Sequence, residues 1–117
     1  DVAIVDTEAG VEHLGRGIAG GADLVIAVLD PSFESIRLSA KIKEMAAEAG
    51  KPTHIILNKV DKETAEQMLD ALDRNDVIAI LPRDKETERK GLRGEPLGST
   101  IENLSDVTTF IIDRMGA

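Results

Sequence analysis

Leu24-Val25-Ile26-Ala27-Val28-Leu29 is a run of six residues that contains no polar side chain. A short apolar run without polar alternation is typical of a strand buried on both faces, which is the usual state of a parallel sheet. Three other runs are almost purely apolar: Val2–Val5, Thr53–Leu57 and Val77–Leu81. The sequence therefore predicts a parallel sheet of about four strands.

Helical patterns lie between the apolar runs. Ser32 is placed to cap one helix that Gly50 ends, and the apolar stripe of that helix is Leu38, Ile42, Met45, Ala46 and Ala49. Asp61 is the expected N-cap of another helix, whose stripe is Ala65, Met68, Leu69 and Leu72. Both stripes repeat at intervals of three and four residues, as on one face of an α-helix. We therefore expect flanking helices that connect successive strands.

The C-terminal part of the chain begins with a long charged connection, residues 82–98, in which one helical turn is expected near residues 85–90. Ser99-Thr100-Ile101-Glu102 matches a capping box and predicts a helix from there to Met115. With a further helix expected near residues 11–18, the order is β-α-β-α-β-α-β-loop-α. This order predicts a single α/β domain, residues 1–117, with right-handed crossovers.

Composition and charge disfavour several classes of function. Fourteen Lys and Arg against 22 Asp and Glu give a net charge of −8, which repels the phosphate backbone of a nucleic acid. The longest apolar run is too short to cross a bilayer. The chain has no Cys, which excludes a thiolate metal site and a Cys nucleophile. We expect a cytoplasmic protein that binds neither nucleic acid nor membranes.

A glycine-rich segment has the spacing of a dinucleotide-binding motif. Gly15-Arg16-Gly17-Ile18-Ala19-Gly20 matches the pattern GxGxxG. In a true site these glycines turn a strand into a helix whose first N–H groups hold a pyrophosphate. Here they follow an expected helix and precede a strand, so we reject the match.

Two segments after expected strands carry the candidate chemistry. Asp6-Thr7-Glu8-Ala9-Gly10 follows the first apolar run. There an acidic residue can hold a magnesium ion through water, and a glycine lets a backbone N–H approach a terminal phosphate. The alternative for Asp6 is a helix cap.

Asn58-Lys59-Val60-Asp61 follows the third apolar run. An Asn-Lys-x-Asp segment can meet a purine base with its amide and carboxylate, while the lysine stem lies along the ring. The alternatives are a chance match and a helix-capping role for Asp61. Since the carboxyl ends of parallel strands share one edge of the sheet, we expect Asp6 and Asn58 to open into a common pocket.

The chain resembles the second half of a P-loop ATPase of the MinD and ParA group, and most closely the CooC-type ATPases that help insert nickel into carbon monoxide dehydrogenase. The resemblance covers essentially the whole chain and is carried by Asp6-Thr7-Glu8-Ala9-Gly10-Val11-Glu12-His13 with Gly15-Arg16-Gly17, by Asn58-Lys59-Val60-Asp61, by Ile80-Leu81-Pro82-Arg83-Asp84 and by Gly94-Glu95-Pro96-Leu97. The rival family is the Era and Ras-like GTPases, whose motif Asp-x-x-Gly is one residue shorter than the Asp-x-x-x-Gly of this chain.

The resemblance implies a role for each matching residue. Asp6 and Gly10 would form the catalytic side, Asp6 by orienting the water shell of Mg²⁺ and Gly10 by meeting the γ-phosphate. The nucleotide-binding residues would be Asn58, Lys59, Asp61, Pro82 and Arg83. Asn58 would bond adenine, and Pro82 with Arg83 would line the base pocket. Asp61 is optional for adenine and would favour guanine.

Two motifs of the family are missing from the 117 residues. No Gly-x-x-x-x-Gly-Lys-[Ser/Thr] loop or its lysine-bearing variant occurs, so the chain is not expected to hydrolyse ATP by itself. We expect ATP and Mg²⁺ in the complete protein and no tight binding of either by this chain alone. The Cys-x-Cys pair of CooC-type proteins is also absent, so nickel binding by the chain is not supported.

These absences suggest a partial P-loop, Rossmann-like fold that lacks the P-loop strand. We expect Val2–Val5 to pair directly with Leu24–Leu29, because unpaired buried backbone groups are costly. Three connecting helices would then cover one face of the sheet, and the last helix would partly cover the other. The remaining apolar surface would favour self-association, such as a homodimer.

The function that we expect is the nucleotide-binding part of a MinD-like ATPase that acts in carbon monoxide dehydrogenase maturation, with that enzyme as the client. One alternative is a noncatalytic interaction or dimerisation module with the same fold. Another is half of a GTPase.

Overall fold

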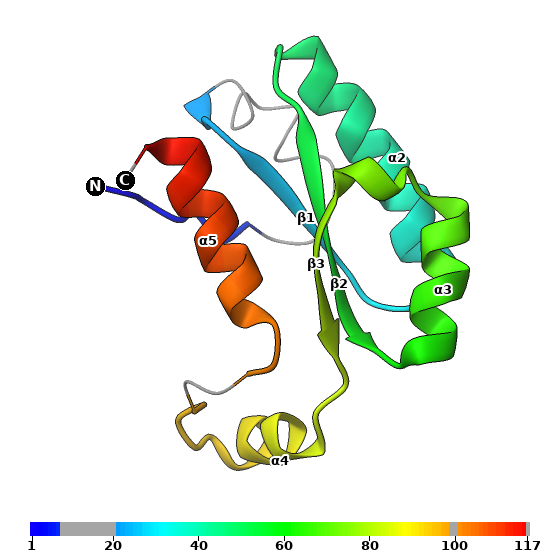
Figure 1. Ribbon diagram of the computed structural model, residues 1–117, viewed down its shortest axis with the longest axis vertical. Helices are drawn as coiled ribbons and strands as arrows, with labels where there is room; N and C mark the ends of the chain where they lie inside the picture. Colours follow the sequence, from blue (N-terminus) through cyan, green and yellow to red (C-terminus); the bar gives the residue numbers. More distant parts are fainter. Residues whose placement is uncertain (8–20, 99–100, 117) are drawn as a thin grey trace.

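A computed structural model describes residues 1–7, 21–98 and 101–116. Its sheet consists of β1 (Val25–Leu29), β2 (Thr53–Val60) and β3 (Val77–Pro82), which are all parallel and lie in the order β1-β2-β3 (Figure 1). The expected α/β class with a parallel sheet is confirmed. The described residues form three strands, one fewer than predicted.

The missing strand is Val2–Val5. Residues 1–7 contain no helix or strand, and Ile4 and Val5 are 81% and 74% exposed. The predicted pairing with β1 is therefore wrong, since β1 pairs with β2 alone among the described residues. An apolar run forms a strand only where a neighbour pairs with its backbone, and no described strand pairs with this run.

Two helices connect the strands and pack on the same face of the sheet. Helix α2 (Phe33–Glu48) follows β1, and α3 (Lys62–Ala71) follows β2. The predicted caps are both present, because Ser35 N donates to Ser32 Oγ at 3.1 Å and Thr64 N donates to Asp61 Oδ1 at 2.8 Å. Beyond the last turn of α2, Gly50 has a φ of 74°, which glycine adopts without steric cost.

The main core lies between this face of the sheet and the two helices. Its buried members are Ala27, Leu29, Ile55, Leu57, Val60, Ala65 and Met68. Leu57 and Val60 are the largest fully buried side chains among the described residues. Aliphatic side chains and the Met68 thioether therefore fill this core. The connection from α3 to β3 contains a short 3-10 helix, η2 (Arg74–Asp76), which Lys43 of α2 holds by an ion pair of 2.6 Å to Asp76.

The charged connection after β3 contains a complete helix, α4 (Lys85–Arg93), longer than the single turn expected. Asp84 caps its N-terminus by accepting from Glu86 N at 3.0 Å and from Thr87 Oγ1 at 2.8 Å. Gly94 ends it at a φ of 68°, in the left-handed region that glycine favours.

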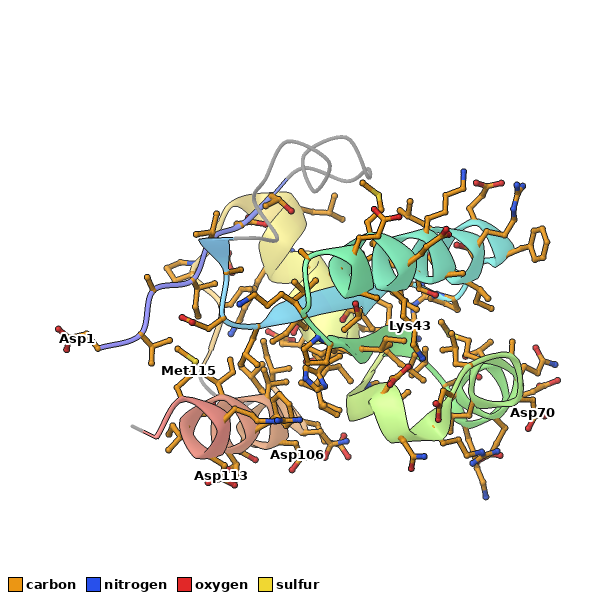
Figure 2. The ribbon with its side chains drawn as sticks, turned by 90° about the horizontal axis from the view of Figure 1, so that it is seen from above. Asp1, Lys43, Asp70, Asp106, Asp113 and Met115 are labelled. Carbon is orange, nitrogen blue, oxygen red and sulfur yellow. The ribbon has the colours of Figure 1, made fainter. Side chains whose placement is uncertain are left out.

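Helix α5 (Leu104–Met115) lies on the opposite face of the sheet from α2 and α3 and packs against β3 (Figure 1). The Phe110 ring of α5 lies 4.6 Å from the ring of His54, measured between the ring centroids. His54 therefore faces α5, whereas the next residue, Ile55, belongs to the main core under α2 and α3. Figure 1 shows α5 on one side of the strands with α2 and α3 on the other. In Figure 2 Asp106 and Asp113 point away from the sheet, as expected for an amphipathic helix.

The predicted start of this helix is wrong. Ile101 and Glu102 precede α5, and Asn103, at a φ of 64°, is its N-cap. The Asn103 amide donates to the carbonyl oxygen of Ile80 at 2.8 Å, which ties the start of the helix to β3 instead of capping it. Ser99 and Thr100 of the predicted capping box lie outside the described residues, as do Gly10 and the glycine-rich segment 15–20.

Across the described ranges, no helix is both long enough and apolar enough to cross a membrane.

Candidate functional site

The carboxyl end of β2 departs from regular pairing with β3. Leu57 lies opposite Ile80 and Val60 opposite Pro82, so two residues of β2, Asn58 and Lys59, face one residue of β3. Lys59 has a φ of 57°, which is uncommon for a residue other than glycine. This is a β-bulge, a feature that often redirects side chains beside functional sites.

A cavity of about 640 Å³ opens next to this bulge, within the range typical of small-molecule sites. Its walls come from the ends of β2 and β3, from α4 and from the start of α5. The lining residues are Asn58, Lys59, Leu81, Pro82, Arg83, Asp84, Thr87, Glu88, Gly91, Leu92, Leu97, Ile101 and Leu104. Four of the five residues predicted to bind nucleotide therefore meet at one cavity.

Asn58 and Lys59 share one carboxylate partner. Asn58 Nδ2 donates to Asp30 Oδ1 at 3.2 Å, and Lys59 Nζ lies 3.8 Å from Asp30 Oδ2. Asp30 directly follows β1, so the contact joins the ends of two neighbouring strands. Reasoning from the sequence did not single out Asp30, although its position after an apolar run was a usable signal.

Pro82 and Arg83 form the wall contributed by β3. The Arg83 backbone N–H donates to the Val60 carbonyl at 3.0 Å, which extends the sheet by one bond past the bulge. Its guanidinium Nε donates to Glu88 Oε1 at 2.8 Å, so α4 balances the charge of this side chain. Arg83 thus lines the cavity with its charge paired to Glu88.

Asp61, the fifth residue predicted to bind nucleotide, caps a helix. It is absent from the cavity lining, and its Oδ1 accepts from Thr64 N at 2.8 Å and from Thr64 Oγ1 at 2.9 Å. The Asp61 N–H donates in return to Thr64 Oγ1 at 3.0 Å, which completes a capping box. These bonds from the Thr64 backbone and hydroxyl lower the pKa of Asp61.

The phosphate end of the expected pocket is not formed by the described residues. Asp6 is exposed in a segment without helix or strand, so the premise that it follows a strand is wrong. It does not line the cavity, and no group of three or more His, Cys, Asp or Glu placed to hold a metal occurs among the described residues. Among the described residues, the cavity therefore gathers Asn58, Lys59, Pro82 and Arg83 but not Asp6.

Comparison with known proteins finds relatives that are named as ATP-binding proteins. The chain is 47% identical over 111 residues to the uncharacterised ATP-binding protein MJ0084 of Methanocaldococcus jannaschii, which covers 95% of the chain and 45% of that protein. It is 32% identical to MJ0685 of the same organism, over 88% of the chain and 43% of that protein. No family model matches the chain, and no solved structure matches it significantly.

A further relative bears the name of the protein type that the sequence motifs resemble. The chain is 31% identical over 86 residues to the carbon monoxide dehydrogenase accessory protein CooC of Rhodospirillum rubrum, over 72% of the chain and 33% of that protein. The resemblance to ATPases of the CooC type is thus confirmed, and the chain is related to a group of ATP-binding proteins. It spans less than half the length of each of these relatives.

Proposed function

We propose that the chain supplies the purine-binding end of the ATP site in a P-loop ATPase of the MinD and CooC type. The strongest support for this proposal is that Asn58, Lys59, Pro82 and Arg83 line the same cavity. Asn58 offers an amide that can both donate to and accept from a base, and the apolar lining can cover the ring.

ATP and Mg²⁺ would act together with a phosphate-binding loop that these 117 residues do not contain. In our proposal Asp6 would orient the water shell of Mg²⁺ and Gly10 would meet the γ-phosphate when such a loop is present. Hydrolysis by this chain alone is not expected, because the backbone cradle and lysine that bind the phosphates are missing.

The biological role that we propose is maturation of carbon monoxide dehydrogenase, with nickel as the cargo and that enzyme as the client, in the cytoplasm. Similarity to CooC supports this role. In a host that lacks the protein, we expect low carbon monoxide dehydrogenase activity that added nickel restores. Activity equal to that of the normal host would contradict the role.

The test of nucleotide binding is calorimetric titration of Mg-ATP into the full-length protein. We expect Asn58→Ala to weaken ATP binding roughly tenfold, because it removes the hydrogen bonds of one amide to the base. Asn75→Ala is the matched control, since Asn75 lies in η2 and does not line the cavity. Equal ATP affinity in wild type and Asn58→Ala would contradict the proposed site.

The same titration separates the alternatives. A noncatalytic interaction module would bind neither ATP nor GTP. A GTPase half would bind GTP more tightly, and Asp61→Ala would remove that preference. The capping bonds of Asp61 and its absence from the lining favour adenine over guanine.

A further inference from the structure

Asp30 limits how the Asn58 amide can be oriented. An ionised carboxylate only accepts hydrogen bonds, so the amide nitrogen of Asn58 must face Asp30, as it does at 3.2 Å. The reversed amide would place its carbonyl oxygen against the carboxylate. The second N–H and the carbonyl oxygen of Asn58 then remain for a ligand in the cavity that this residue lines.

The backbone strengthens this arrangement. In a regular strand Asn58 and Lys59 would point to opposite faces, but the bulge and the positive φ of Lys59 interrupt that alternation. Both side chains consequently reach the one carboxylate at the end of β1. The Lys59 ammonium places a positive charge beside Asp30 without occupying the amide.

We propose that Asp30 is a positioning residue that makes the site prefer purines with an amino group at position 6 over purines with an oxygen there. This inference rests on the proposed nucleotide-binding function. A 6-amino purine offers a donor to the Asn58 oxygen and its N7 as an acceptor to the remaining N–H. A 6-oxo purine presents acceptors at both places, so it would meet the amide oxygen unfavourably unless the amide reversed against Asp30.

The test compares ATP with inosine triphosphate, which carries oxygen at position 6 and, like ATP, no amino group at position 2. Affinities are measured by calorimetry on the full-length protein. We expect wild type to prefer ATP and Asp30→Ala to reduce that preference roughly tenfold, because the freed amide can turn its N–H groups toward the oxygen. ATP should bind more weakly and inosine triphosphate at least as tightly as before.

Two further variants act as controls. Asp70→Ala removes an exposed carboxylate that bonds Arg74 at 3.2 Å, away from the cavity, and should leave the ratio unchanged. Asp61→Ala should also leave the ratio of ATP to inosine triphosphate unchanged. Since Asp30 is about half exposed and caps no helix, Asp30→Ala should melt close to wild type.

The results distinguish a failure of the proposed role of Asp30 from a failure of the proposed nucleotide binding. If wild type binds ATP but Asp30→Ala keeps the same preference, or loses both nucleotides equally, the role of Asp30 is overturned while nucleotide binding stands. If wild type binds neither nucleotide, the proposed function fails and the role of Asp30 fails with it.

Discussion

Four consecutive residues at the end of β2 perform different tasks. Asn58 and Lys59 turn toward Asp30 and the cavity, Val60 is 2% exposed in the core, and Asp61 caps α3. The bulge makes this division possible, because it releases two side chains from strand alternation just before the helix starts. A motif read from the sequence as one ligand-binding unit is therefore partly a folding signal.

The cap at Asp61 predicts a pH-dependent contribution to stability. Bonds from Thr64 lower the pKa of Asp61 from 3.8, so the folded state favours the carboxylate. The stabilisation is fully present above the unfolded value and is lost as the pH falls through the lower folded value. We expect Asp61→Ala to be less stable than wild type near pH 7 and the difference to shrink toward pH 3, measured by urea unfolding.

Thr64→Val provides a control, because it removes the reciprocal hydroxyl but leaves the Thr64 backbone donor position intact. It should reproduce part of the loss near neutral pH. A difference between wild type and Asp61→Ala that stays constant from pH 7 to pH 3 would show that the charged cap does not contribute.

Among the helices and strands, those fixed by neighbouring residues were predictable and those fixed by distant partners were not. Capping side chains and apolar spacing located α2 and α3, since both signals are local. The prediction of a strand at Val2–Val5 was wrong because a strand requires a paired neighbour. The predicted start of α5 was wrong because the Asn103 amide bonds Ile80, which lies 23 residues away in the sequence.

The same reasoning applies to the candidate site. Strand ends that share an edge brought Asn58, Lys59, Pro82 and Arg83 together, as the parallel topology predicts. Asp30 lies at that edge too, but its contacts depend on a bulge and on a positive φ at Lys59, and no local pattern in the sequence predicts either feature.

A buried histidine of β2 contacts α5. His54 is 6% exposed, contacts the Phe110 ring at a tilt of 60° and has an Nε2 without a hydrogen-bond partner. Burial, and next the nearby Arg114, lower the pKa of His54, while Asp76 acts in the opposite direction. The unfolded chain therefore binds a proton more readily, so stability is complete above the unfolded value of 6.5 and falls as the pH drops below it.

We expect the melting temperature of wild type to fall between pH 7.5 and pH 5.5, and His54→Leu to reduce this dependence, because leucine has no proton to bind. The carboxylate effects of Asp61 lie at lower pH and should not interfere. Amide hydrogen exchange should show that α5 loses protection before α2 as the pH falls. An unchanged pH dependence in His54→Leu would contradict the assignment.

At the scale of the whole molecule, the two faces of the sheet are covered unequally. Helices α2 and α3 close one face, whereas α5 packs beside β3 and leaves Val28 of β1 58% exposed on the other. Val28 pairs with Ile56, which is buried, so the cover of this face ends between β2 and β1. The outer edge of β1 pairs with no strand among the described residues.

An apolar face beside an unpaired strand edge favours association with another chain. We therefore expect this chain, when produced by itself, to self-associate through β1, as sedimentation equilibrium can measure. Val28→Lys should weaken that association roughly tenfold, because a contact would bury an ammonium without a partner. Leu92→Lys is the matched control, since Leu92 is 90% exposed on α4 and lies away from β1. If both variants weaken association equally, or if the wild-type chain stays monomeric up to its solubility limit, β1 is not the contact surface.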